Sequence, residues 1–409
     1  MNPAGGAPLR TAVAFLAAAL FVLPFSSSVA LRNAFLALAA ASVLYALARS
    51  GLPAPRLPPR RVLVPMLAWG AWCVASVAWS IEPAYSRGEL RPELLYPFAA
   101  FLLFFVATPD ARALDRWAWA LAAGLAALAL LAIAQAAGPG EWNPKRWHGD
   151  VGFFATHVVL ALPLVAWAFL RAPREARLLR AALAATAVLT FVVTAWNDNR
   201  IAWIALAVMT LLAALLAGTA IAPARRARLA LATLVALAAL ATLFALSVQN
   251  RTEMLAGTER EAEAQLQHDP RLAIWRFAAR RVADSPWVGH GFGRGILRGE
   301  FRSGSVPGVD NPLYTHGHNT ALNVALQGGL VGLALFAWMV GAVVREMAAG
   351  LREAPPRRHV AALGLVLVAG FAVRNMTDDF LVRHNALLAW ALAGAVLGAL
   401  RPASARTPG

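Results

Sequence analysis

Long uninterrupted apolar blocks recur along the whole chain, and stretches rich in arginine, proline and other polar residues separate them. A helix needs roughly 20 apolar residues to cross the hydrocarbon core of a bilayer. Lipid offers the backbone no hydrogen-bond partners, so a spanning segment is either a helix or a strand of a closed barrel. The blocks are continuous rather than alternating, which excludes barrel strands. The sequence therefore predicts an all-α, polytopic membrane protein.

The composition of the chain supports this prediction. Apolar residues make up 59% of the 409 residues and charged residues 14%, whereas soluble domains are near half apolar and a quarter charged. A net charge of +16 is also typical of proteins that bind nucleic acid. The arginines, however, punctuate the apolar blocks as loop charges do in membrane proteins. We therefore expect membrane lipid, and no nucleic acid, as a partner.

The blocks predict about twelve transmembrane helices. The first run ends in Ser28-Val29-Ala30, which resembles a signal-peptide cleavage site, but further blocks follow at once and we interpret the run as a retained helix. The expected helices cover residues 11–28, 30–48, 62–80, 94–108, 117–137, 151–170, 181–197, 201–219, 229–248, 319–344, 360–376 and 385–400.

Arginines in the short loops predict the orientation of these helices. They concentrate in alternate loops, near residues 49–61, 171–180, 225–228 and 345–358, and the intervening short loops carry fewer. Loops rich in arginine and lysine remain in the cytoplasm. Both termini are therefore expected on the cytoplasmic side.

One connection is much longer than the others. Residues 249–318 are polar, fall on the periplasmic side and are expected to contain an amphipathic helix that starts at Asp269-Pro270. The chain then divides into residues 1–248 with the first nine transmembrane helices, residues 249–318 as a periplasmic loop, and residues 319–409 with three further transmembrane helices and a short cytoplasmic tail.

Two arginines on the periplasmic side are candidate anion ligands. Arg200 opens an apolar helix beside Asp198, where a charge either has a function or forms an ion pair within a tight turn. Arg271 lies among apolar residues in the first turn of the loop helix, and its guanidinium has the bidentate geometry that phosphates accept. The alternative for the arginines of this helix is a solvated basic face, which we favour for Arg280 and Arg281.

His316 and His318 lie just before the tenth predicted helix, and Asn319 follows them. A histidine that titrates near neutrality can deprotonate a hydroxyl group. Two histidines one residue apart are also typical of zinc sites, but the sequence shows no third ligand at metal spacing. Asn319 is alternatively a helix cap beside exposed histidines. We therefore predict no metal site and no cofactor.

Asp378 and Asp379 lie between the last two helices, with Arg374 and Arg383 nearby. Paired carboxylates suggest acid–base chemistry, but with two arginines alongside we favour a structural ion-pair network. The glycine run of residues 289–295 does not have the G-x-G-x-x-G spacing and follows no predicted strand, so we interpret it as a turn.

Six of these segments together resemble the superfamily of O-antigen ligases and polymerases, with the ligase branch favoured. The segments follow one another in the family's order and span roughly residues 180–385. They are residues 199–203 (NRIAW), 271–275 (RLAIW), 284–293 (DSPWVGHGFG), 318–319 (HN), 328–333 (GGLVGL) and 375–380 (NMTDDF).

The resemblance implies an inverting, metal-independent glycosyltransferase in the bacterial inner membrane, with its active site on the periplasmic face. The donor is a glycan on undecaprenyl diphosphate and the acceptor is a sugar hydroxyl of lipid A–core. His318 matches the family's histidine and is the expected catalytic base. The residues expected to contact substrate are Arg200, Arg271, His316, Asn319, Asp378 and Asp379.

Two other functions remain open at this point. A polymerase would join lipid-linked repeat units and could use the same residues. A non-enzymatic transporter of lipid-linked glycans would place ionisable residues near the middle of the membrane on broken helices, whereas here they cluster at one interface.

Overall fold

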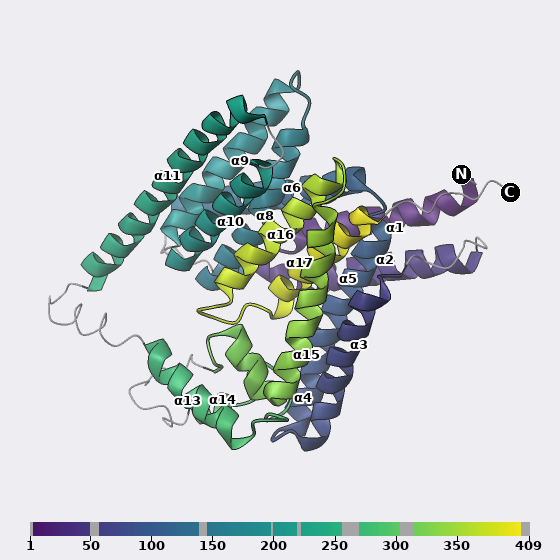
Figure 1. The fold of residues 1–409 in the computed structure, drawn as a ribbon, viewed down its shortest axis with the longest axis vertical. Helices are drawn as coiled ribbons and strands as arrows, with labels where there is room; N and C mark the ends of the chain where they lie inside the picture. Colours follow the sequence, from purple (N-terminus) through teal and green to yellow (C-terminus); the bar gives the residue numbers. More distant parts are fainter. Residues whose placement is uncertain are drawn as a thin grey trace.

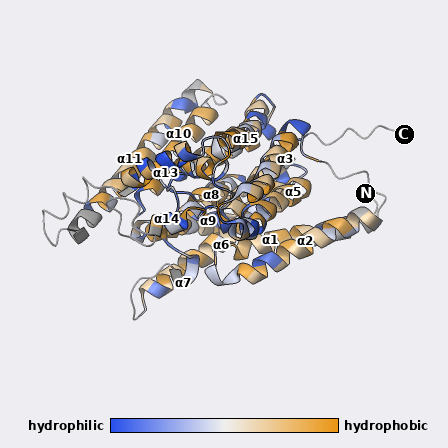
Figure 2. Cartoon of the chain, turned by 90° about the horizontal axis from the view of Figure 1, so that it is seen from below, coloured by the Kyte–Doolittle hydropathy of each residue, from blue (hydrophilic) through white to orange (hydrophobic). Residues whose placement is uncertain are grey.

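The computed structural model describes residues 3–49, 57–138, 145–197, 199–218, 222–255, 270–302 and 315–401. Within these ranges the regular structure is entirely helical, as predicted, and no strand occurs. The longer helices form a bundle, and α13 and α14 lie at one end of it (Figure 1). Apolar residues cover most of the helices, while hydrophilic residues gather toward helix ends and loops (Figure 2).

Each of the twelve predicted apolar helices corresponds to a helix in the structure. In chain order these are α1 (Pro3–Val22), α2 (Val29–Arg49), α3 (Arg60–Ala75), α5 (Tyr96–Ala107), α6 (Ala111–Ala136), α8 (Val151–Arg171), α9 (Arg177–Trp196), α10 (Arg200–Gly218), α11 (Pro223–Leu255), α15 (Thr320–Gly350), α16 (Arg357–Arg374) and α17 (Arg383–Leu400).

Shorter elements connect these helices. They are the 3-10 turns η1 (Ser26–Ser28) and η2 (Ser76–Trp79), the helices α4 (Pro83–Glu89), α7 (Lys145–His148), α13 (Pro270–Asp284) and α14 (Arg298–Arg302), and the π-helical turn η3 (Leu90–Leu95). Among the described residues, nine helical segments are long and apolar enough to cross a membrane. The helices α1, α16 and α17 also match predicted spans, but are not among these nine.

The main difference from the sequence prediction lies before α5. We expected the fourth helix to begin at residue 94, but one apolar helical segment runs from Pro83 to Ala107 through α4, η3 and α5. Its first half carries Arg87, Glu89, Arg91 and Glu93, so hydropathy alone did not reveal it. The acidic side chains at this end bind the 285–302 region, as described below.

The carboxyl-terminal helices form the centre of the bundle. Helix α17 packs along α5, and α16 packs against α10, α15, α8 and α17. A Cβ atom on Gly394 would lie 2.1 Å from the carbonyl oxygen of Phe101, so only glycine allows α17 and α5 to approach this closely. This packing fixes the start of α15, the end of α16 and the start of α17 relative to one another.

Helix α13 confirms the helix predicted within the long polar connection, although Asp269 lies outside the described residues. Its apolar residues Ile274 and Phe277 pack with Leu326 of α15. The expected boundaries at residues 248 and 318 stay predictions. Helix α11 itself continues to Leu255, and residues 256–269, 303–314 and 402–409 lie outside the described ranges.

Candidate functional site

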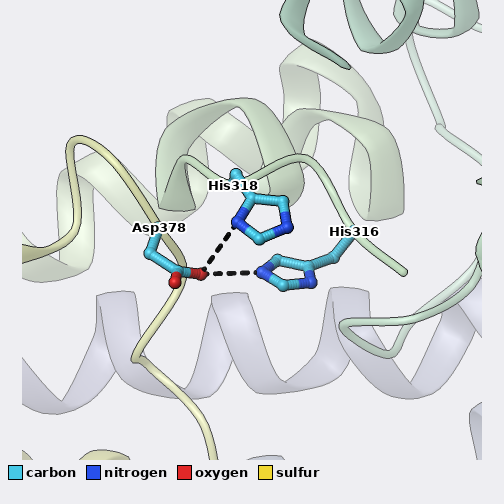
Figure 3. Close-up of side chains that lie close together, drawn as sticks. All are labelled: His316, His318 and Asp378. Carbon is cyan, nitrogen blue, oxygen red and sulfur yellow. Dashed lines mark hydrogen bonds and ion pairs between the residues drawn. The ribbon is translucent and has the colours of Figure 1, made fainter. Parts of the chain in front are cut away.

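Two histidines and one aspartate form the centre of the candidate site (Figure 3). His316 and His318 belong to the segment that leads into α15, and Asp378 belongs to the segment between α16 and α17. Oδ1 of Asp378 lies 2.8 Å from Nε2 of His316 and 3.4 Å from Nδ1 of His318. The two imidazole rings stack with their centroids 4.0 Å apart. We call these three residues the His–Asp cluster.

The cluster holds a negative charge beside a neutral imidazole. Burial acts to raise the pKa of Asp378, but the hydrogen bonds and charges of His316 and His318 outweigh it and keep this pKa well below its ordinary value. Burial lowers the pKa of His316 to about 4; Asp378 opposes this shift, and Arg294 and His318 reinforce it. At neutral pH Asp378 is therefore ionised and His316 is neutral.

His318 adopts an unusual backbone conformation. Its φ angle is +46°, in the left-handed region that costs a residue other than glycine about 1–3 kcal/mol unless the surroundings hold it there. Nε1 of Trp275 in α13 donates to the carbonyl oxygen of His318 at 3.3 Å. The held backbone directs Nδ1 of His318 toward Asp378. A carboxylate on one ring nitrogen orients the other nitrogen to act as a base.

Asn319 is a structural member of the site. Its Oδ1 accepts the backbone N–H of Leu322 at 3.0 Å and so caps α15. Its Nδ2 donates to the carbonyl oxygen of Met376 at 2.9 Å. Asn319 therefore joins the two segments that carry the cluster, in agreement with the capping alternative.

Asp378 and Asp379 point into different surroundings. The Asp378 side chain is 24% exposed, whereas Asp379 is buried. Oδ2 of Asp379 accepts from Asn323 Nδ2 at 2.7 Å, and its Oδ1 lies 2.8 Å from the Thr320 hydroxyl. Asp379 thus fixes the segment to α15, and only Asp378 reaches the histidines.

The two arginines predicted as anion ligands both lie at helix starts. Arg200 is the first residue of α10, and Asp198, its suggested partner, lies outside the described residues. Arg271 lies in the first turn of α13, the helix whose Trp275 contacts His318. Both side chains are half-buried, whereas Arg280 is exposed. Arg281 differs from the expected solvated face because it pairs with Asp284 and Glu300.

Arg294 is a site residue that the sequence did not reveal. Its NH2 atom lies 2.8 Å from Nε2 of His316 and 3.3 Å from Oδ1 of Asp378. It lies within the glycine run of residues 289–295, which the structure confirms as a turn. The only sequence signal was an arginine within that turn, because the contact with Asp378 spans 84 residues of sequence.

The expected ion-pair network of Asp378 and Asp379 with Arg374 and Arg383 is wrong for the described residues. Asp378 pairs with Arg294 instead. Arg374 is fully buried, and its guanidinium donates to Thr156 Oγ1, Asn199 Oδ1 and the carbonyl oxygen of Gly152. Arg374 therefore joins α16 to α8 and to the residue that precedes Arg200.

Asp378 is a third potential metal ligand, which the spacing of residues in the sequence did not indicate. One ligand atom each from His316, His318 and Asp378 lie within 4.8 Å of one another, close enough to hold a metal ion. The guanidinium of Arg294 lies against two of these atoms, and its positive charge opposes a second cation there. That the site holds no metal ion stays a prediction. Its basis is now the positive charge of Arg294, because a third potential ligand is present after all.

The fold and the site together define a polytopic α-helical membrane protein with a histidine–aspartate–arginine centre where a polar connection meets the helix ends. Residues 185–337 match the model of the O-antigen ligase family. A Rickettsia prowazekii (strain Madrid E) protein, provisionally named a polysaccharide ligase, is 32% identical over 83 residues. That match covers 19% of this chain and only 20% of the relative. The two comparisons confirm the resemblance to the O-antigen ligase superfamily.

Proposed function

We propose that the protein transfers a glycan from undecaprenyl diphosphate to a sugar hydroxyl of lipid A–core, on the periplasmic face of the bacterial inner membrane. The observation that carries the proposal is the orientation of His318 by Asp378. His318 lies within residues 185–337, which match the O-antigen ligase family, and Asp378 lies beyond them. Activity, substrates and partners are all part of this proposal.

His318 acts as the general base. Nδ1 faces the ionised Asp378, so Nε2 takes the proton of the acceptor hydroxyl. The hydroxyl oxygen bonds to the anomeric carbon of the donor as the bond from that carbon to the diphosphate oxygen breaks. Attack opposite the leaving group inverts the anomeric centre. The diphosphate departs with the bonding electrons.

The departing diphosphate needs positive charge, which arginine supplies in the absence of a metal ion. Arg200 and Arg271 lie at helix starts, where backbone N–H groups also favour anions. Their planar guanidinium groups bind phosphate oxygens through two parallel hydrogen bonds. These two residues are the proposed diphosphate ligands.

A cavity beside the cluster supports a lipid-linked substrate. Its volume is about 440 Å³, and its wall is almost entirely apolar, with Phe336, Val343, Leu367 and Phe371 among the residues of α15 and α16. It reaches Asn319, next to His318 in the chain. Cavities of this size and polarity hold lipid-like ligands, so an isoprenoid chain placed here would keep its diphosphate near the site.

Reconstitution tests the proposal directly. Purified protein in vesicles receives an undecaprenyl-diphosphate-linked glycan and lipid A–core. We expect glycan-modified lipid A–core as the product. Longer lipid-linked chains without any modified lipid A–core would favour the polymerase instead. Movement of the donor across the bilayer without a new covalent product would favour the transporter.

A further inference from the structure

Arg374 is a fully buried cation at the end of α16. A guanidinium stays charged in a protein, yet the side chain of Arg374 has no exposed surface. No carboxylate of the described part of the chain lies within ion-pair distance of it, and its hydrogen bonds go to three neutral oxygen atoms. A buried charge without a countercharge is costly. An arginine at this position therefore needs a reason that packing alone does not give.

The three acceptors connect Arg374 to two other helices. Its Nε donates to Thr156 Oγ1 at 3.1 Å, and its NH2 donates to the carbonyl oxygen of Gly152 at 3.1 Å, both in α8. Its NH1 donates to Oδ1 of Asn199 at 2.7 Å. Asn199 directly precedes Arg200, the first residue of α10. The guanidinium thus holds the residue beside Arg200 against α8.

Arg374 also contacts the segment that carries Asp378. Its guanidinium carbon lies 4.6 Å from the centre of the Phe380 ring, and Phe380 follows Asp378 by two residues. The N–H of Phe380 donates at 2.8 Å to Oδ1 of Asn375, the residue next to Arg374. One buried side chain therefore contacts both the Asp378 segment and the residue that precedes Arg200.

Asn199 depends on Arg374 for the position of its side chain. Within the described residues, the bond to Arg374 is the only hydrogen bond of that side chain. The carbonyl oxygen of Asn199 accepts from the N–H of Ala202 at 3.0 Å and so belongs to the first turn of α10. A guanidinium binds phosphate oxygens through a planar fork whose direction matters. Release of Asn199 would let the start of α10, and Arg200 with it, move.

We propose that Arg374 is a positioning residue that fixes the start of α10 through Asn199, so that Arg200 is held in one place relative to Asp378. The inference rests on the proposed function, in which Arg200 binds the donor diphosphate and Asp378 orients the base. This separation has to be held, because a misplacement of about 1 Å can lower a rate on the order of 100-fold. The unpaired charge of Arg374 also favours an anion at the neighbouring Arg200.

A matched pair of substitutions tests the proposal. Asn199→Ala and Thr156→Val each remove one acceptor of Arg374, but only Asn199 adjoins Arg200. The measurement is the affinity of the purified protein in detergent for undecaprenyl diphosphate, together with the thermal unfolding midpoint. We expect Asn199→Ala to weaken binding about 10-fold and Thr156→Val to leave it within about twofold of native, although both lower the midpoint. Native affinity in Asn199→Ala, or an equal loss of affinity in Thr156→Val, would overturn the proposal.

A double-mutant cycle gives the second test. Arg374→Gln should weaken the binding of undecaprenyl diphosphate about 10-fold in the native background. In an Arg200→Ala background it should change binding little, because the effect passes through Arg200. Equal losses in both backgrounds would show that Arg374 acts independently of Arg200 and would overturn the proposal. If Arg374→Gln does not fold, Asn199→Ala takes its place in the same cycle.

The Arg200→Ala variant separates this inference from the proposed function. Native affinity for undecaprenyl diphosphate in Arg200→Ala would contradict Arg200 as a diphosphate ligand, and this inference with it. Weaker binding in Arg200→Ala beside native binding in Asn199→Ala would contradict only the role of Arg374. In the transfer assay, Asn199→Ala should raise the KM for the donor and leave the KM for lipid A–core unchanged.

Discussion

At the residue scale, two histidines separated by one glycine differ in what they can do. The His316 side chain is 5% exposed and lies between Arg294 and Asp378. The His318 side chain is 12% exposed, and its backbone lies in the left-handed region, where Trp275 of α13 donates to its carbonyl oxygen. Sequence patterns alone gave no means of distinguishing them. The family resemblance favoured His318, and the structure supplies a physical reason for the same choice.

Conservative substitution of the arginines tests the diphosphate site. Arg200→Lys and Arg271→Lys should each lower the transfer rate by about 10–100-fold, because lysine is a point charge without the planar fork. Arg280→Lys is the matched control on an exposed face and should keep nearly native activity. The measurement is the reconstituted transfer rate at matched protein levels. Equal transfer rates in all three variants would contradict the diphosphate site and favour a solvated basic face.

Chelation tests the prediction of a site without metal. EDTA-treated protein should transfer glycan at the native rate, because the guanidinium of Arg294 already supplies a positive charge at the three potential ligands. The measurement is transfer before and after chelation, with Mg²⁺, Mn²⁺ and Zn²⁺ added back singly. Activity lost with EDTA and restored by one of these ions would show that the cluster is a metal centre.

At the element scale, the sequence predicted helices well and their polar extensions poorly. Apolar blocks located all twelve long helices because burial in lipid demands such blocks. Helix α15 nevertheless continues to Gly350, and Glu346 in this extension pairs with Arg61 of α3. The charged first half, from Pro83, of the helical segment that ends in α5 was likewise missed. This half is stabilised by tertiary contacts such as the pair of Glu82 with Arg298, and hydropathy does not report such contacts.

The candidate site was predictable in its residue types but not in its pairing. His318, Asp378 and the arginines were recognised as unusual polar residues near helix ends. The side-chain contact of His316 with Asp378 spans 62 residues of sequence, and nothing local indicates it. Arg294 could not be recognised from its local sequence either, because its contact with Asp378 spans 84 residues.

A glycine within α15 provides a test at this scale. Gly329 has φ +66° and ψ −168°, a conformation essentially restricted to glycine. A Cβ atom there would lie 2.3 Å from the Trp287 carbonyl. Gly329→Ala should therefore lower the thermal unfolding midpoint in detergent, with a destabilisation of at least about 1–3 kcal/mol.

Gly341 is the matched control for this substitution. It lies in the same helix, and a Cβ atom there would meet no atom within 4 Å. Gly341→Ala should leave the unfolding midpoint unchanged or raise it, because alanine is the better helix former. Equal midpoints for Gly329→Ala, Gly341→Ala and the native protein would contradict a requirement for glycine at position 329.

At the scale of the whole molecule, the His–Asp cluster lies where α15 begins and α16 ends. The loop arginines predict that this end of the bundle faces the periplasm. The proposed reaction requires the same orientation, because its lipid A–core acceptor is expected to be available on that face.

Cysteine labelling tests the orientation. In a Cys73→Ala background, Arg276→Cys places a thiol on the exposed face of α13, and Arg352→Cys places one in the turn between α15 and α16. In cells with a permeabilised outer membrane, an impermeant reagent should label position 276. Position 352 should react only after lysis of the inner membrane. The opposite pattern would invert the topology and exclude a periplasmic site.

The most direct measurement of the central claim is glycan transfer to lipid A–core by the native protein, His318→Ala and His316→Ala in matched vesicles, with donor binding measured separately. Loss of a general base typically lowers a rate by about 10²–10⁴-fold. We therefore predict that His318→Ala nearly abolishes transfer while the donor still binds, and that His316→Ala loses much less. An active His318→Ala beside an inactive His316→Ala would reverse the two assignments. Activity in both variants would contradict a histidine base.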